Sequence, residues 1–417
     1  MPLRAFLASV IAFAVLAIPA RPYSVQTHQQ IIDLVWLQSI QPLLLSQYPG
    51  LTPKQLQEAH AYAYGGSAIQ DLGYYPFGNA FFSNLTHYVR SGDFVLALIR
   101  DARNANELAF AVGALSHYLG DTYGHSECVN PSVATVFPSL AKKYGPMVTY
   151  EENEHAHVRT EFAFDINEIS KRHFAPLAYL RHVGLEIPTR LLNRAFFETY
   201  GLDAVSVVGH RRPVLRSYRF AVRSFLPRIA YAESILHRHS FPPDDPNPQY
   251  STLAADLAQA SIDNHWEEYR HRPGIGTYSL AGLIFLLPKV GPLNLLAIRG
   301  PVPSTEELYV ASVNDTVTKL RGHLQDFDAL SHDVPNRDLD TGLDVRPGSY
   351  RLTDQTYATL LRDVTADPTR PVPPILKHDL IAYYADPNAP ISTRRNKNQW
   401  AQVQANLATL ASVPTTH

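Results

Sequence analysis

Three residues with metal-binding side chains follow one another at four-residue spacing near the middle of the first half of the chain. They are His117, Asp121 and His125, in the segment AVGALSHYLGDTYGH. Residues four apart lie on one face of an α-helix, with neighbouring Cβ atoms about 5–6 Å apart. A zinc ion at about 2.0–2.2 Å from each ligand atom can bridge that gap. The spacing therefore predicts a helix that presents metal ligands along one face.

A second pair with the same spacing, His157 and Glu161, lies in the segment HVRTE. His155 competes with His157, but only His157 stands four residues before Glu161. Such pairs also occur on solvated helix faces. Around the first set, however, apolar residues such as Leu115 line the helix, and buried imidazoles and carboxylates need partners. This context favours a metal site over a solvated face.

Helices must position these side chains. Thr27 is predicted as an N-cap of a helix with an apolar stripe, which places His28 in its first turn. A helix beginning at Thr52-Pro53 leads to Asp71, and His87 follows in the aromatic segment FFSNLTHY. No convincing alternating strand pattern is found up to residue 164, so an all-α fold is predicted.

The rest of the chain continues in helical patterns interrupted by prolines. Its most apolar stretch is Ser279–Ile298, which prolines and glycine split into halves too short to cross a bilayer. A buried helical hairpin is the favoured interpretation, and an interfacial segment that grips lipid is the alternative. The arginines between 211 and 223 are interpreted as a solvated helix face rather than a phosphate-binding strip.

Composition sets further bounds on the protein. The chain has 417 residues, of which 45% are hydrophobic and 18% charged, and its net charge of −2 provides no global attraction for nucleic acid or anionic lipid. Arg4 precedes an apolar run over residues 5–20, which is short for a span of about 20 residues. We therefore expect residues 1–22 to be a cleaved signal peptide and the protein to be periplasmic, secreted or on the cell surface. An uncleaved anchor is the alternative.

Cys128 is the only cysteine, so no intrachain disulfide can form. It follows His125 by three residues and is a candidate soft metal ligand. A small buried hydrophobe is the favoured role.

The candidate ligands show a family resemblance when they are taken in chain order. They are His28, Asp71, His87, His117, Asp121, His125, His157 and Glu161. Their contexts, LSHYLGD at 115–121, HVRTE at 157–161, THQQI, IQDLGYY and LTHY, resemble the zinc-dependent phospholipase C family. The resemblance has motif support over about residues 23–165 and extends, without such motifs, to about residue 270.

The resemblance implies two to three zinc ions. The first ion would be held by Asp71, His87, His117 and Asp121, and the second by His125, His157 and Glu161. A third would be held by His28 and the mature N-terminal amine and carbonyl, with Asp121 bridging. Two departures are visible: fewer residues separate Asp121 from His125 than is usual, and no Trp lies between residues 20 and 28. Either Tyr23 takes the place of that Trp after processing, or the third site is altered.

The resemblance also predicts the architecture and the reaction. We expect a phospholipase C/nuclease-like helical domain over residues 23–270 and a mostly helical C-terminal extension over 271–417. The implied activity is hydrolysis of a phosphodiester, most simply a glycerophospholipid cut on the glycerol side, by a metal-activated water. Asp71 is the residue suggested to accept the proton of that water, and peripheral contact with a membrane is the partner interaction considered.

Two other functions stay open. Three-zinc single-strand nucleases and nucleotidases share this scaffold and ligand order, but they add basic grooves and aromatic platforms. The near-neutral charge argues against a stable nucleic-acid partner. The other alternative is a metal-binding surface protein without catalytic activity.

Overall fold

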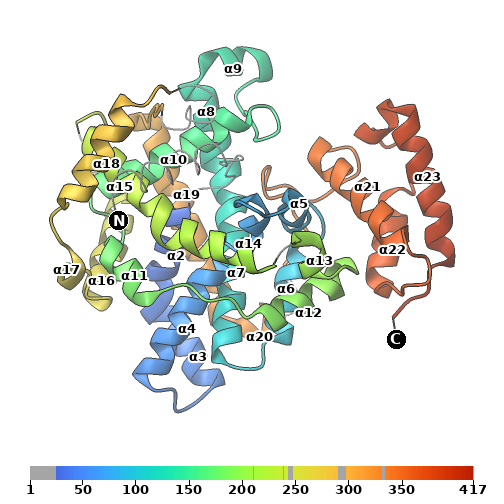
Figure 1. Cartoon of the computed structure of the whole chain (residues 1–417), viewed down its shortest axis with the longest axis horizontal. Coiled ribbons are helices and arrows are strands. Elements are labelled where there is room, and N and C mark those ends of the chain that lie inside the picture. Colours follow the sequence, from blue (N-terminus) through green and yellow to red (C-terminus); the bar gives the residue numbers. More distant parts are fainter. Residues whose placement is uncertain are drawn as a thin grey trace.

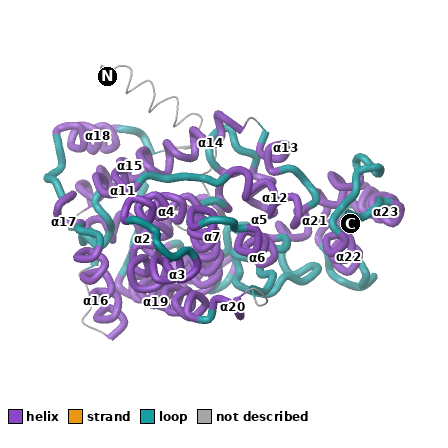
Figure 2. Tube along the Cα trace, turned by 90° about the horizontal axis from the view of Figure 1, so that it is seen from below, coloured by secondary structure: helices purple, strands orange, loops and turns teal. Residues whose placement is uncertain are grey.

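The computed structural model describes residues 25–209, 211–237, 239–242, 248–289, 297–330 and 334–416. Every regular element in these ranges is a helix, so the fold is all-α as predicted (Figures 1 and 2). The expected signal peptide at 1–22, and Tyr23, lie outside the described residues.

The helices up to residue 200 include the short 3-10 and π segments marked η. They are α2 (Val25–Val35), η1 (Trp36–Ile40), α3 (Gln41–Gln47), α4 (Pro53–Gly66), η2 (Gln70–Tyr74), α5 (Ala80–Tyr88), α6 (Ser91–Asp101), α7 (Ala105–Tyr123), η3 (Gly124–Val129), α8 (Asn130–Val136), α9 (Pro138–Tyr144), α10 (Glu154–Ser170), α11 (Leu177–Val183) and α12 (Thr189–Tyr200).

The later helices are α13 (Ala204–Val208), α14 (Arg211–Phe220), η4 (Ala221–Phe225), α15 (Leu226–His237), α16 (Pro248–Asp263), α17 (Trp266–Tyr269), α18 (Ile275–Leu286), α19 (Pro303–Gln325), α20 (Phe327–Leu330), α21 (Arg351–Thr365), α22 (Pro374–Tyr383), η6 (Ser392–Arg395) and α23 (Lys397–Ser412).

The helix starts reflect capping side chains. Thr52 and Gln55 form a capping box at α4, and Asn104 accepts a hydrogen bond from a backbone N–H of the first turn of α7. The predicted N-cap Thr27 was wrong, because α2 already begins at Val25. The carboxylate of Asp165, from α10, instead accepts the backbone N–H groups of Gln26 and Thr27. A distant helix thus satisfies the donors that a local cap was expected to satisfy.

Helix α7 runs through the middle of the body, and α4 packs closely along it (Figure 1). Glycines permit this approach. A Cβ at Gly66 would lie 2.0 Å from the Phe110 carbonyl oxygen, and one at Gly113 would lie 2.2 Å from that of Ala63. Any larger residue at these positions would force the two backbones apart, so the glycines set how α7 sits in the core.

The C-terminal part divides into an inner helix and an outer lobe. Helix α19 packs against α2, α7 and η3 and contributes to the same hydrophobic core. Helices α21, α22 and α23 lie to one side of the body (Figure 1, red). The expected domain boundary at residue 270 stays a prediction.

The apolar stretch Ser279–Ile298 is only partly buried where it is described. In α18, Leu280, Ala281 and Ile284 pack on α15, whereas Phe285 is 71% and Leu286 78% exposed. Residues 290–296, which include most of the second arm of the expected hairpin, lie outside the described residues. None of the described helices has both the length and the apolar character needed to span a bilayer.

Candidate metal centre

The structure brings all eight predicted ligands together from α2, η2, α5, α7, η3 and α10. They form three groups in which the candidate ligand atoms lie within 4.8 Å of one another. The groups are His28, His117 and Asp121; Asp71, His87 and His117; and His125, His157 and Glu161. None of these residues is more than 3% exposed. His117 belongs to two groups, so the first two form one continuous cluster.

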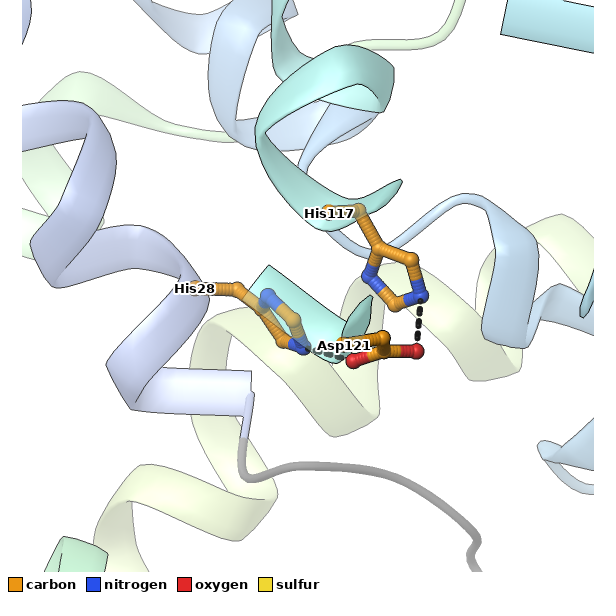
Figure 3. A group of neighbouring side chains, drawn as sticks. All are labelled: His28, His117 and Asp121. Atoms are coloured by element: carbon orange, nitrogen blue, oxygen red, sulfur yellow. Dashed lines mark ion pairs between the residues drawn. The ribbon is translucent and has the colours of Figure 1, made fainter. Parts of the chain in front are cut away.

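Asp121 faces the imidazoles of His28 from α2 and His117 from α7 (Figure 3), and that of His87 from α5. Its Oδ1 lies 3.3 Å from His28 Nε2, and its Oδ2 lies 3.1 Å from His117 Nε2. The rings of His28 and His117 stack with centroids 4.3 Å apart. Since α2 and α7 are far apart in the sequence, this contact depends on how the helices pack.

The second group places two imidazoles head to head. His87 Nδ1 donates to the Ser83 carbonyl at 2.7 Å, and His117 Nδ1 donates to the Ser67 carbonyl at 3.0 Å. A carbonyl oxygen can only accept, so each Nδ1 carries a proton, and in the neutral imidazole each Nε2 then has the lone pair that binds a metal. The two Nε2 atoms are nevertheless 3.5 Å apart. Two facing lone pairs repel unless a proton or a metal ion lies between them, and zinc bound through Nε2 meets that requirement.

Asp71 completes the second group from the 3-10 helix η2. Its Oδ1 lies 3.4 Å from His87 Nε2 and 3.9 Å from His117 Nε2. Both oxygens of Asp71 and both of Asp121 are buried and accept no well-aligned hydrogen bond among the described residues. Buried carboxylates of this kind require a positive partner. Imidazole nitrogens and carboxylate oxygens are also the donors that zinc takes in catalytic sites, so the residues fit the metal.

The third group surrounds one carboxylate oxygen. Glu161 Oε1 lies 3.1 Å from His125 Nε2 and 3.0 Å from His157 Nε2. The helix that carries His117 and Asp121 widens into the π-helix η3 directly before His125. His155 is exposed, whereas His157 is buried in the group.

The pKa values of the two buried aspartates are shifted in opposite directions. Burial raises the pKa of Asp71 to about 6, although His117 and His87 oppose the rise. Burial acts on Asp121 in the same direction, but His117 and His125 outweigh it and hold the Asp121 pKa well below its usual value. A divalent cation would favour the ionised form of both carboxyls.

A small cavity of about 10 Å³ opens onto the third group. It is lined by Tyr74, His87, Tyr88, His125, Tyr150, His157, Glu161 and Asp340. The tyrosines and Asp340 were not among the predicted site residues. Asp340 belongs to an acidic loop more than two hundred positions after His125, and the one available signal was the unusual DLDTGLD composition of that loop.

Two other polar or reactive residues lie outside the groups. His60 Nε2 lies 3.1 Å from Asp33 Oδ1, which also accepts the hydroxyl of Tyr64. Cys128 is fully buried in the hydrophobic core, as favoured from the sequence.

Residues 27–207 match a family model described as zinc dependent phospholipase C. The matched range contains all eight ligands, from His28 to Glu161, and ends before Asp340. No curated protein and no solved structure matches the chain.

Proposed function

We propose that the protein is an exported enzyme that hydrolyses glycerophospholipids on the glycerol side of the phosphodiester. The premise is the match of residues 27–207 to the zinc-dependent phospholipase C family of hydrolases. The observation that carries the proposal is the head-to-head pair of His87 and His117, flanked by the carboxylates of Asp71 and Asp121.

The residues divide into three ligand sets. Asp71, His87, His117 and Asp121 would hold one zinc ion, and His125, His157 and Glu161 a second. His28, with Asp121 as a bridging carboxylate, would hold a third together with the mature N-terminus. The set of His125, His157 and Glu161 matches one group in the structure, and the other two sets divide the continuous cluster in which His117 is shared.

Zinc, when bound, lowers the pKa of a coordinated water and stabilises negative charge on phosphoryl oxygens. The role proposed for Asp71 is to accept the proton of that water. Its carboxylate has two buried oxygens without well-aligned hydrogen bonds, so one can bind metal while the other receives a proton. The carboxylate of Asp121 lies within 3.3 Å of the Nε2 atoms of His28, His87 and His117. It would therefore contribute oxygen ligands to two neighbouring ion sites.

Charge balance explains the attraction of a phosphodiester. Asp71, Asp121 and Glu161 contribute three negative charges, against six positive charges if three zinc ions bind. The resulting positive centre, buried from solvent, favours an anionic substrate and the additional charge of its transition state.

A membrane contact is proposed at the exposed apolar residues of α18. Ile275, Tyr278, Phe285 and Leu286 are each more than half exposed on this one helix. Arg272 precedes the helix and Lys289 follows it, which suits a lipid surface with anionic phosphates. Helix α18 packs on α15, and α15 packs on α10, which carries His157 and Glu161 (Figure 1). The contact would therefore be anchored to the zinc-binding helices.

The decisive experiment is an assay of the purified, zinc-loaded protein on phosphatidylcholine vesicles and on single-stranded DNA. We expect diacylglycerol and phosphocholine from the vesicles and no cleavage of DNA. Cleavage of DNA alone would identify a nuclease, and firmly bound zinc without either reaction would identify a metal-binding surface protein. Both outcomes would overturn the proposal.

Export has its own test. N-terminal sequencing of the protein recovered outside the cytoplasm is expected to begin between residues 21 and 24, next to α2 and His28. An intact Met1 on the recovered protein would contradict cleavage.

A further inference from the structure

One segment from the C-terminal part of the chain lies directly across the metal centre. We name residues 334–345 the strap. Its backbone is held by side chains of the zinc-binding domain, since Tyr118 donates to the Pro335 carbonyl and Ser91 to the Arg337 carbonyl, each at 2.6 Å. The N–H of Leu339 donates to the carbonyl of the ligand His87 at 3.1 Å. The strap is thus joined to helices α5, α6 and α7.

The strap also contacts the end of α7 that leads to His125. Gly342 has a φ of +71°, and a Cβ there would lie 2.7 Å from the Thr122 carbonyl oxygen. Asn130, just after η3, donates its side-chain amide to the Asp340 carbonyl at 2.7 Å. The strap around Asp340 therefore contacts the chain both before η3, at Thr122, and after η3, at Asn130. The π-helix between these contacts carries His125.

Asp340 points its carboxylate toward that ligand. Its Oδ2 accepts the hydroxyls of Tyr350 at 2.6 Å and Tyr88 at 3.0 Å, and its Oδ1 lies 3.5 Å from His125 Nδ1. The same Nδ1 donates to the Leu339 carbonyl at 3.1 Å. Two consecutive strap residues thus face the side of the imidazole opposite the group that contains Glu161.

We propose that Asp340 is a positioning residue for the zinc site formed by His125, His157 and Glu161, and that the strap is an integral part of this site. The inference rests on the proposed function, because it assumes that the site binds zinc. The Leu339 carbonyl and the Asp340 carboxylate keep the proton on Nδ1, so that Nε2 presents its lone pair to the metal. A negative charge beside Nδ1–H also makes Nε2 a stronger ligand.

Two tyrosines orient the carboxylate of Asp340. They supply two donors to Oδ2 and so hold the side chain in one orientation while Oδ1 stays directed at the imidazole. Asparagine has nearly the same shape as aspartate but no charge. If its amide oxygen accepts the tyrosine hydroxyls, its NH2 group faces the Nδ1–H of His125, and in the other orientation the NH2 group faces the two hydroxyls. The substitution Asp340→Asn therefore removes the electrostatic support with little change in volume.

The test is zinc binding by the full chain carrying Asp340→Asn, measured by chelator competition and by metal content after dialysis. We expect one of the bound ions to be held about 10–100-fold more weakly. In cobalt-substituted protein, we also expect altered visible absorption bands, which report the ligand geometry directly. The matched control is Asp379→Asn in the outer lobe, where the carboxylate likewise accepts a tyrosine hydroxyl, that of Tyr357, at 3.1 Å. This control should bind zinc as the unchanged protein does.

The outcomes are separable. Unchanged zinc affinity and cobalt bands in Asp340→Asn would overturn this inference while leaving the proposed function intact. A protein that binds no zinc in its natural sequence would overturn the proposed function itself. If Asp340→Asn fails to fold, Tyr350→Phe removes one donor to Oδ2 and should weaken zinc binding by a smaller factor; unchanged binding in that variant would overturn the inference.

Discussion

Gly120 lies against the imidazole of His28, so closely that a Cβ on Gly120 would stand 3.1 Å from both Cε1 and Nδ1 of that ring. Gly120 is on α7 and His28 on α2, and the missing side chain is what lets the imidazole stack on His117 and reach Asp121. The absence of a side chain thus helps to build the cluster.

We expect Gly120→Ala to displace His28 by a few tenths of an ångström and to weaken the zinc ion that His28 would hold. Zinc titration should show one ion lost preferentially, while the others remain. Gly322→Ala in α19 is the control, because nothing lies within 4 Å of that position. There the substitution should stabilise the fold by about 0.5–1 kcal/mol through helix propensity. Equal zinc binding in the two variants would argue against the close approach.

His117→Ala and Asp121→Ala should abolish hydrolysis and release metal, since His117 belongs to two groups and Asp121 faces three imidazoles. Loss of several kcal/mol of transition-state stabilisation corresponds to a rate decrease of more than about a thousandfold. Activity and zinc content are measured together. His60→Ala removes another buried imidazole, outside the groups, and should keep its zinc. Full activity of either ligand variant would refute the assignment.

His157→Ala and His155→Ala form a matched pair two residues apart on α10. The first removes a nitrogen 3.0 Å from Glu161, and the second removes an exposed side chain. We expect metal loss and strongly reduced activity only for His157→Ala. Comparable zinc loss in both variants would show that the wrong histidine has been chosen.

Removal of zinc with a chelator should destabilise the protein as well as inactivate it, because the buried carboxylates of Asp71 and Asp121 then lose the positive charge of the metal. Thermal unfolding with and without zinc measures the effect. Histidine ligands must be neutral to bind metal, and although burial opposes it, Asp121 and Glu161 raise the pKa of His125 to about 9. Protons therefore compete with the metal, and zinc affinity should fall as the pH is lowered below about 9. A transition temperature unaffected by zinc would contradict a metal site at this position.

The double variant Phe285→Ser, Leu286→Ser tests the proposed lipid contact. We expect weaker vesicle binding and a raised KM on vesicles, with unchanged kcat/KM on a soluble short-chain phosphodiester. Ile375→Ser in α22 is the control, because Ile375 is also exposed (68%) but lies in the outer lobe. Similar vesicle binding by both variants would exclude α18 as the contact.

Helical periodicity and capping patterns in the sequence were sufficient to predict the helices and the pairs of ligands that lie on one helix. His117 and Asp121, and likewise His157 and Glu161, are paired by helical periodicity alone, which follows from hydrogen bonds between near neighbours in the chain. The start of α2 was mispredicted for the opposite reason. The groups that satisfy its first N–H donors belong to Asp165, more than a hundred residues away.

The sequence by itself determined the all-α class, the chemical type of the ligands and their spacing along each helix, because these depend on side-chain identity and local backbone geometry. Only the tertiary structure decided that His28, Asp71 and His87 meet α7, and that Leu339 and Asp340 reach His125. Those contacts depend on glycine-mediated helix packing and on the path of the strap, which side-chain periodicity does not encode.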